Sequence, residues 1–152
     1  MLNQTEFLIE TAALKLPRLY QTLVNLYGET EGKRIYQDIF EDGFKKRYKQ
    51  FKGKDIGEIM KAEEAFFPLM GWEIEIEKVK DSEGAYYLEH LKKCPHLEAT
   101  KKYGLELPCE IICGLDIYFA EKYKLALWQR LKHLPSGDSE CCFKIRSNSV
   151  AK

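Results

Sequence analysis

The sequence contains no cysteine before Cys94, and all five of its cysteines lie from that residue onward. No two of them have the CxxC spacing that is typical of a structural zinc site. Histidine is also scarce, with 3 residues in the whole chain. These shortages argue against a zinc finger. They also confine any thiol chemistry to the C-terminal part of the chain.

The sequence also has no excess of positive or of negative charge. Lys and Arg number 24, Asp and Glu number 24, and the formal net charge is zero. This balance gives no electrostatic reason to expect nucleic acid or an anionic membrane as a partner. No segment approaches the roughly 18 apolar residues of a membrane span, and the N-terminus does not resemble a secretory signal. We therefore expect a cytoplasmic protein whose thiols stay reduced.

The length of 152 residues fits a single domain, 1–152. Apolar residues recur at three- and four-residue steps and predict helices over about 4–27 and 31–51. Pro17 should kink or split the first helix. Asp55 is expected to cap a third helix that ends near Met70, with Glu58 completing a capping box. Residues 1–70 thus form a helical front part.

Strict alternation begins at Trp72 and predicts a strand. A turn at 81–84 returns it as a hairpin, and a second hairpin joins 124–134 to 140–146. A short helix at 96–103 and a longer one from Pro108 to about Tyr123 lie between the two hairpins. The expected fold class is α+β, with N-terminal helices packed on a small antiparallel sheet of two hairpins and a helix inserted between them. The sheet and the Cys-rich part occupy residues 71–147.

The spacing of the cysteines suggests which of them lie together. On one helix, Cys109 and Cys113 share a face, because residues four apart are neighbours there. On the last strand, Cys141 and Cys142 point to opposite faces. One consistent arrangement places three cysteines around a cavity between sheet and helix, with two carboxylates at its edge: Cys94, Cys113 and Cys141, with Asp116 and Asp138.

Three interpretations of these cysteines remain open. They can be small apolar core residues, since free cysteine is often buried. They can bind zinc or another thiophilic transition metal, with Cys94, Cys113 and Cys141 as ligands. One of them can be a nucleophile, which needs a base or a helix N-terminus to lower its pKa. Cys109 is near such an N-terminus, and His96 is the best placed histidine.

The order of these motifs resembles that of a known family. Cys-Pro follows a hairpin, Cys-x3-Cys-x2-Asp follows on a helix, and Gly-Asp-x2-Cys-x-Phe lies on a final strand. The set covers about residues 72–146 and is similar to the L-2-amino-thiazoline-4-carboxylic acid hydrolase-like proteins. The matching residues are Cys94, Pro95, Cys109, Cys113, Asp116, Gly137, Asp138, Cys141 and Phe143.

This resemblance implies a small cytosolic hydrolase that opens a cyclic amidine, a thiazoline ring, to an N-carbamoyl cysteine. Its catalytic residues would be Cys113, Asp116, Cys141 and Asp138. A metal on the three cysteines can generate the attacking hydroxide, or a thiolate can attack directly while Asp116 or Asp138 moves the proton. The sequence leaves both routes open.

The alternative is a non-catalytic domain that binds a small molecule or a metal in the same cavity. A more distant likeness to the vinyl-reductase-type small-molecule-binding domains points this way. In either case the expected partner is a small molecule rather than a nucleic acid or a membrane. The aromatic-rich helices can line a pocket or bury a dimer face, so a homodimer is a further expectation.

Overall fold

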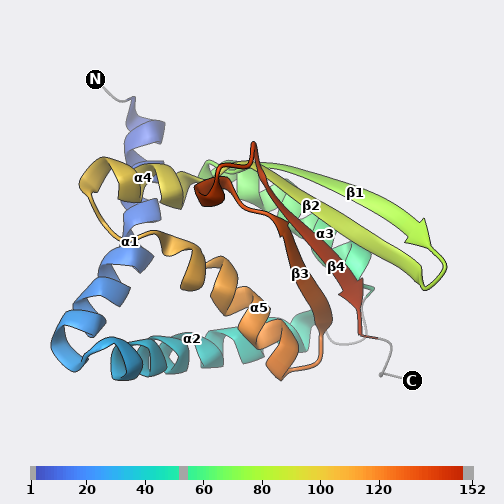
Figure 1. Cartoon of the computed structure of the whole chain (residues 1–152), viewed down its shortest axis with the longest axis horizontal. Helices are drawn as coiled ribbons and strands as arrows, with labels where there is room; N and C mark the ends of the chain where they lie inside the picture. Colours follow the sequence, from blue (N-terminus) through green and yellow to red (C-terminus); the bar gives the residue numbers. More distant parts are fainter. Residues whose placement is uncertain (1–2, 52–54, 149–152) are drawn as a thin grey trace. The chain divides into compact units, whose positions relative to one another are not determined.

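A computed structural model describes residues 3–51 and 55–148 of the chain. Figure 1 shows helices and a sheet of antiparallel strands, as expected for an α+β fold. The chain divides into two compact units, and each is built from two separate segments. One unit comprises Met1–Lys52 and Pro95–Phe119, and the other comprises Gly53–Cys94 and Ala120–Lys152. The α+β class is confirmed, whereas the single domain stays a prediction.

The first unit begins with a pair of helices, α1 (Gln4–Tyr27) and α2 (Glu29–Phe51). The side chain of Asn3 accepts a hydrogen bond from the backbone N–H of Glu6, and the backbone N–H of Asn3 donates one to the carboxylate of Glu6, which makes a capping box. The helix α1 continues through Pro17 as one element, so it is not split. Gly28, with a φ of 81°, separates the two helices, which is a conformation that glycine adopts without strain.

The rest of the first unit corrects one prediction. After α4 (Pro95–Tyr103), Pro108 starts a short 3-10 turn, η2 (Pro108–Glu110), and an α-helix forms only at α5 (Cys113–Lys122). The single helix predicted from Pro108 to Tyr123 is therefore wrong. Ile111 lies in the break and is buried against Leu23 and Tyr36, so core packing overrides helical continuity. Cys109 and Cys113 do not share one helix.

The second unit contains the sheet, in the order β1-β2-β4-β3. The strands are β1 (Glu73–Asp81), β2 (Gly84–Lys93), β3 (Ala126–Lys132) and β4 (Cys141–Ser147). All three pairings are antiparallel, and the two predicted hairpins are confirmed. The pairing of β2 with β4 joins the hairpins, which leaves β1 and β3 at the edges.

The helix α3 (Ile56–Phe66) packs on one face of this sheet. A Cβ atom added to Gly57 would lie 2.3 Å from the hydroxyl oxygen of Tyr87, so any other residue here would have to displace the Tyr87 side chain. Asp55 is the N-cap, but its side chain makes no capping hydrogen bond, so the predicted capping box is wrong. The turn η1 (Phe67–Met70) ends the segment as a 3-10 helix rather than as more α-helix.

The strand alternation separates two faces of the sheet. Cys141, Phe143 and Ile145 share with Tyr87 the buried face, on which α3 packs. Cys142 is the cross-strand partner of His90, and both lie on the opposite face, which we call the polar face. Glu73, Glu75 and Glu77 of β1 are exposed there, as expected for an edge strand.

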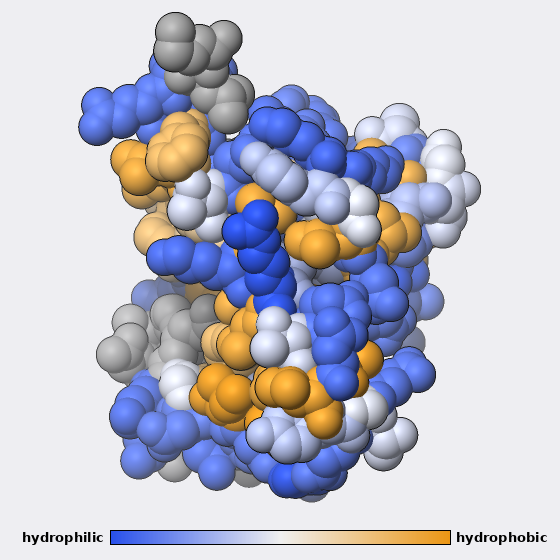
Figure 2. Space-filling model, turned by 90° about the vertical axis from the view of Figure 1, so that its left-hand side faces the viewer, coloured by the Kyte–Doolittle hydropathy of each residue, from blue (hydrophilic) through white to orange (hydrophobic). Residues whose placement is uncertain are grey.

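The surface carries apolar side chains as well as charged ones. Figure 2 shows orange hydrophobic residues between blue hydrophilic residues on one side of the molecule. Along α1, the exposed large apolar residues are Phe7, Leu8, Leu26 and Tyr27. None of the helices within residues 3–51 and 55–148 is long and apolar enough to cross a membrane.

Candidate functional site

The turn between β3 and β4 gathers two of the predicted site residues. Leu134 begins a 3-10 turn, η3 (Leu134–Ser136), which has Pro135 as its second residue, and Gly137 ends it with a φ of 101°. The carboxylate of Asp138 accepts a hydrogen bond of 2.7 Å from the backbone N–H of His133. The next backbone N–H, of Leu134, donates to the Sγ atom of Cys141 at 3.3 Å. Consecutive amides therefore hold the carboxylate and the thiol.

Cys141 is the buried thiol of this turn, with 8% of its surface exposed. The backbone N–H of Leu134 fixes the direction of this sulfur within the turn. In the same turn, Nδ1 of His133 lies 2.8 Å from Oγ of Ser136. The turn thus places a thiol, a carboxylate and an imidazole within nine residues of one another in the chain, from His133 to Cys141.

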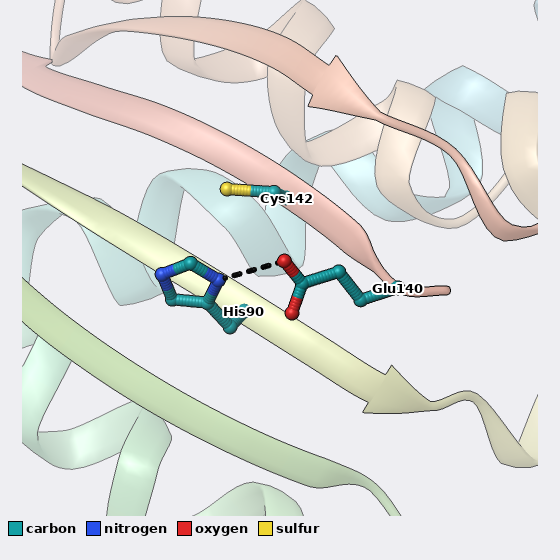
Figure 3. Close-up of side chains that lie close together, drawn as sticks. All are labelled: His90, Glu140 and Cys142. Carbon is teal, nitrogen blue, oxygen red and sulfur yellow. Dashed lines mark hydrogen bonds and ion pairs between the residues drawn. The ribbon is translucent and has the colours of Figure 1, made fainter. Parts of the chain in front are cut away.

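A second cluster lies next to this turn, on the polar face. His90 of β2, Cys142 of β4 and Glu140, which directly precedes β4, bring one donor atom each to within 4.8 Å of one another. Figure 3 shows the three side chains converging from the two central strands. Nδ1 of His90 lies 3.2 Å from Oε1 of Glu140. Among the described residues, this is the set of three such donors that is close enough to hold a metal ion.

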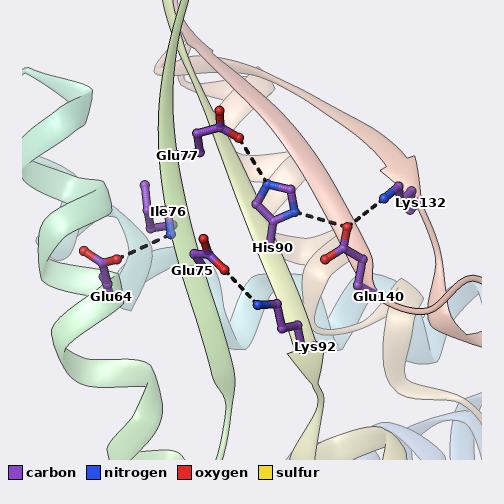
Figure 4. A network of polar contacts seen from close by, with 8 residues as sticks. All are labelled: Glu64, Glu75, Ile76, Glu77, His90, Lys92, Lys132 and Glu140. Carbon is purple, nitrogen blue, oxygen red and sulfur yellow. Dashed lines mark hydrogen bonds and ion pairs between the residues drawn. The ribbon is translucent and has the colours of Figure 1, made fainter.

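Charged residues surround the cluster, as Figure 4 shows. Lys132 donates a hydrogen bond of 2.8 Å to Oε1 of Glu140. Oε2 of Glu77 lies 3.8 Å from Nε2 of His90, so carboxylates flank both nitrogens of the ring. Beside them, Lys92 pairs with Glu75 at 2.8 Å.

Burial and neighbouring charges shift the pKa values of Glu140 and Cys142 in this cluster. The hydrogen bond from Lys132 holds the pKa of Glu140 below its usual value. Burial opposes this effect, and the hydrogen bond to His90 lowers the pKa further. Burial raises the pKa of the Cys142 thiol, and the negative charge of Glu140 adds to this. At neutral pH, Glu140 is therefore ionised and Cys142 keeps its proton.

The remaining predicted residues are divided between the two units. Cys94 directly follows β2 in the second unit, whereas Cys113 and Asp116 begin α5 in the first. The metal site predicted from Cys94, Cys113 and Cys141 draws on both units and stays a prediction. Within the first unit, Asp116 affects the buried side chain of Tyr36. Burial raises the pKa of Tyr36 most, and the negative charge of Asp116 raises it further.

Sequence reasoning did not bring His90, Glu140 and Cys142 together. The alternation along β4 placed Cys142 correctly on the face away from Cys141. The missing information was the register of β2 against β4, which pairs His90 with Cys142 across the middle of the sheet. His96, the histidine that was preferred, is instead held through Nδ1 by the backbone oxygen of Ala13 at 2.7 Å.

Comparison with known proteins places the chain in a family. The family model for L-2-amino-thiazoline-4-carboxylic acid hydrolase matches residues 6–145, which is nearly the whole chain. No curated protein and no solved structure gave a significant match. The match includes both the helical front part and the Cys-rich end that carries the motifs. The chain belongs to the L-2-amino-thiazoline-4-carboxylic acid hydrolase family.

Proposed function

We propose that this protein hydrolyses a cyclic amidine of the 2-amino-thiazoline-4-carboxylate type, with Cys141 as the nucleophile. The family match over residues 6–145 supports the substrate class. The hydrogen bond from the Leu134 N–H to Cys141 Sγ is the observation that supports the reaction type. This donor fixes the direction of the sulfur, and cysteine is one of the side chains that form covalent intermediates in catalysis.

The proposed reaction proceeds in two balanced steps. The Cys141 thiolate bonds to the amidine carbon, the ring C–S bond breaks, and the leaving sulfur takes the proton that the thiol gave up. Water then attacks the same carbon, the bond to Cys141 breaks, and the thiol regains a proton. The net change adds one water to the ring and gives an N-carbamoyl cysteine with a free thiol. Covalent catalysis of this kind replaces one difficult step by two easier ones.

Asp138 is the proposed proton carrier. One of its oxygens is fixed by the His133 N–H, and the next amide along the chain holds Cys141, so the two side chains share one rigid turn. General acid–base catalysis by such a group contributes roughly 10²–10⁴-fold to a rate. Cys113 and Asp116, which the family resemblance assigns to catalysis, are further proposed members, and the same assay tests them.

Turnover by single variants tests this proposal. The full-length protein is incubated with 2-amino-thiazoline-4-carboxylate, and the carbamoyl product is measured by mass spectrometry. Cys141→Ala is expected to lower kcat/KM by roughly 10³-fold or more, because it removes the nucleophile. Cys109→Ala, which alters a half-buried thiol outside the turn, is the matched control and keeps its activity. Equal losses in the two variants would refute the assignment of Cys141.

A groove beside α3 supports a second candidate, a non-catalytic binding domain. This open groove of about 300 Å³ lies between α3 and the β1–β2 hairpin. Its lining combines apolar with charged side chains, including Met60, Lys61, Glu64, Ile76, Lys78 and Tyr87. Small-molecule sites also combine apolar side chains with polar groups that fix the orientation of the ligand. Saturable binding of the thiazoline without turnover, weakened by Lys78→Ala, would favour this candidate over the enzyme.

A further inference from the structure

The polar face of the sheet carries a set of donor atoms that the proposed hydrolysis does not use. His90, Glu140 and Cys142 offer an imidazole nitrogen, a carboxylate oxygen and a sulfur. This mixture suits zinc and its thiophilic relatives, whereas Mg²⁺ and Ca²⁺ take oxygen ligands alone. Cys142 points away from the face that carries Cys141, so the two thiols serve different environments.

The distances within the set match a metal site. Two ligands at about 2.0–2.1 Å from zinc in a tetrahedron lie roughly 3.3 Å apart. The observed separation of His90 Nδ1 and Glu140 Oε1 is 3.2 Å. All three donor atoms lie within 4.8 Å of one another, so they are grouped closely enough to share one ion.

The backbone holds these ligands in place before any metal arrives. His90 and Cys142 are register partners on β2 and β4, the two central strands of the sheet. Cys142 is 3% exposed, whereas the side chains of His90 and Glu140 are 20% and 12% exposed. The sulfur is therefore shielded, while the open side leaves room for a water as fourth ligand.

Two neighbouring charged residues, Glu77 and Lys132, would affect how strongly the site binds a metal. Glu77 lies 3.8 Å from Nε2 of His90, where it can orient the ring, as carboxylates do for metal-binding histidines. Lys132 bonds to Oε1 of Glu140 at 2.8 Å and so competes with a cation for that oxygen. Its side chain is 50% exposed, which allows it to turn into solvent.

We propose that His90, Glu140 and Cys142 bind a thiophilic divalent metal ion of the zinc class and so tie β2 to the start of β4. Binding replaces the proton of the Cys142 thiol by the metal, and that proton goes to solvent. This site is independent of the proposed hydrolysis.

Cobalt is the probe, because a thiolate ligand gives Co²⁺ a charge-transfer absorption. The full-length protein is purified under reducing conditions, stripped with a chelator and titrated with Co²⁺, and Zn²⁺ is then used to displace it. The wild-type protein is expected to show the absorption with one ion per chain. Cys142→Ser should lose it, whereas Cys109→Ser should keep it. Glu77→Gln should weaken binding by about tenfold, as the loss of an outer partner does.

The Lys132→Met variant tests the proposed metal site while all three ligands are kept. Because it removes a competing cation, it is expected to tighten Co²⁺ binding by several fold and to leave the fold intact. A wild-type protein that binds neither Co²⁺ nor Zn²⁺ would overturn the proposal. An absorption that survives in Cys142→Ser but disappears in Cys113→Ser would overturn it as well, in favour of the site predicted from Cys94, Cys113 and Cys141.

Discussion

The backbone of Gly32 in α2 lies directly against the backbone of Leu23 in α1. A Cβ atom on Gly32 would be 2.9 Å from the carbonyl oxygen of Leu23 and 2.8 Å from the nitrogen of Val24. These are backbone atoms, so no side-chain rotation can relieve the contact. The close approach of the two helices therefore depends on glycine at this position.

Gly32→Ala should destabilise the protein, because the two helices must move apart. Overpacking of this kind costs about 1–3 kcal/mol. Gly43→Ala is the matched control in the same helix, since a Cβ there meets nothing within 4 Å. It should stabilise the helix by about 0.5–1 kcal/mol through propensity alone. Urea unfolding of both variants measures the difference, and a stabilised Gly32→Ala would refute the contact.

His96 should make the stability depend on pH. Burial lowers its pKa below the ordinary value of 6.5, against a smaller opposing effect of the bond to Ala13. The unfolded chain thus binds the proton more tightly than the folded chain. Stability should fall as the pH drops below about 6.5 and should level off below the lowered pKa.

His96→Asn provides the control for this effect. Its amide can donate to the Ala13 oxygen, as the imidazole nitrogen does, but it does not titrate. The difference between the unfolding free energies of wild type and variant should therefore shrink or reverse from pH 7.5 to pH 5. A constant difference across this range would show that His96 does not contribute to the pH dependence.

The two adjacent buried thiols should differ in reactivity. Cys141 faces a backbone N–H donor, whereas Cys142 lies beside the carboxylate of Glu140, whose charge opposes a thiolate. Their exposures of 8% and 3% are both low. Iodoacetamide labelling of the native, chelator-treated protein, followed by peptide mass analysis, should therefore modify Cys141 before Cys142. Faster labelling of Cys142 would contradict the assigned environments.

Much of the sheet could be predicted because its signals are local. The alternation from Trp72 onward and the turns at 81–84 and 135–138 fix both hairpins within short stretches of sequence. The alternation along β4 also separated the faces of Cys141 and Cys142. Pairing between the hairpins is a long-range property, and no local pattern in the sequence sets β2 against β4 with His90 opposite Cys142.

Two features of the helices could not be predicted from local sequence signals. Pro108 correctly marked the start of a helical turn, but the burial of Ile111 against Leu23 and Tyr36 interrupts the helix before Cys113. Propensity and spacing cannot reveal that break, because it arises from tertiary packing. The capping box predicted at Asp55 is also wrong. The sequence pattern is present, but the side chain of Asp55 makes no capping hydrogen bond.

We propose that this family member opens a cyclic amidine with the thiol of Cys141. Asp138→Asn refines it, because the amide oxygen can still accept the His133 N–H while the carboxylate is lost. This variant should lower kcat by roughly 10²-fold.

The most direct measurement is the appearance of N-carbamoyl cysteine from 2-amino-thiazoline-4-carboxylate, compared between wild type, Cys141→Ala and Cys109→Ala. Wild type and Cys109→Ala are expected to turn the substrate over, and Cys141→Ala is expected to lose turnover. Undiminished turnover by Cys141→Ala, or no turnover by correctly folded wild type, would show that Cys141 is not the nucleophile of such a hydrolase.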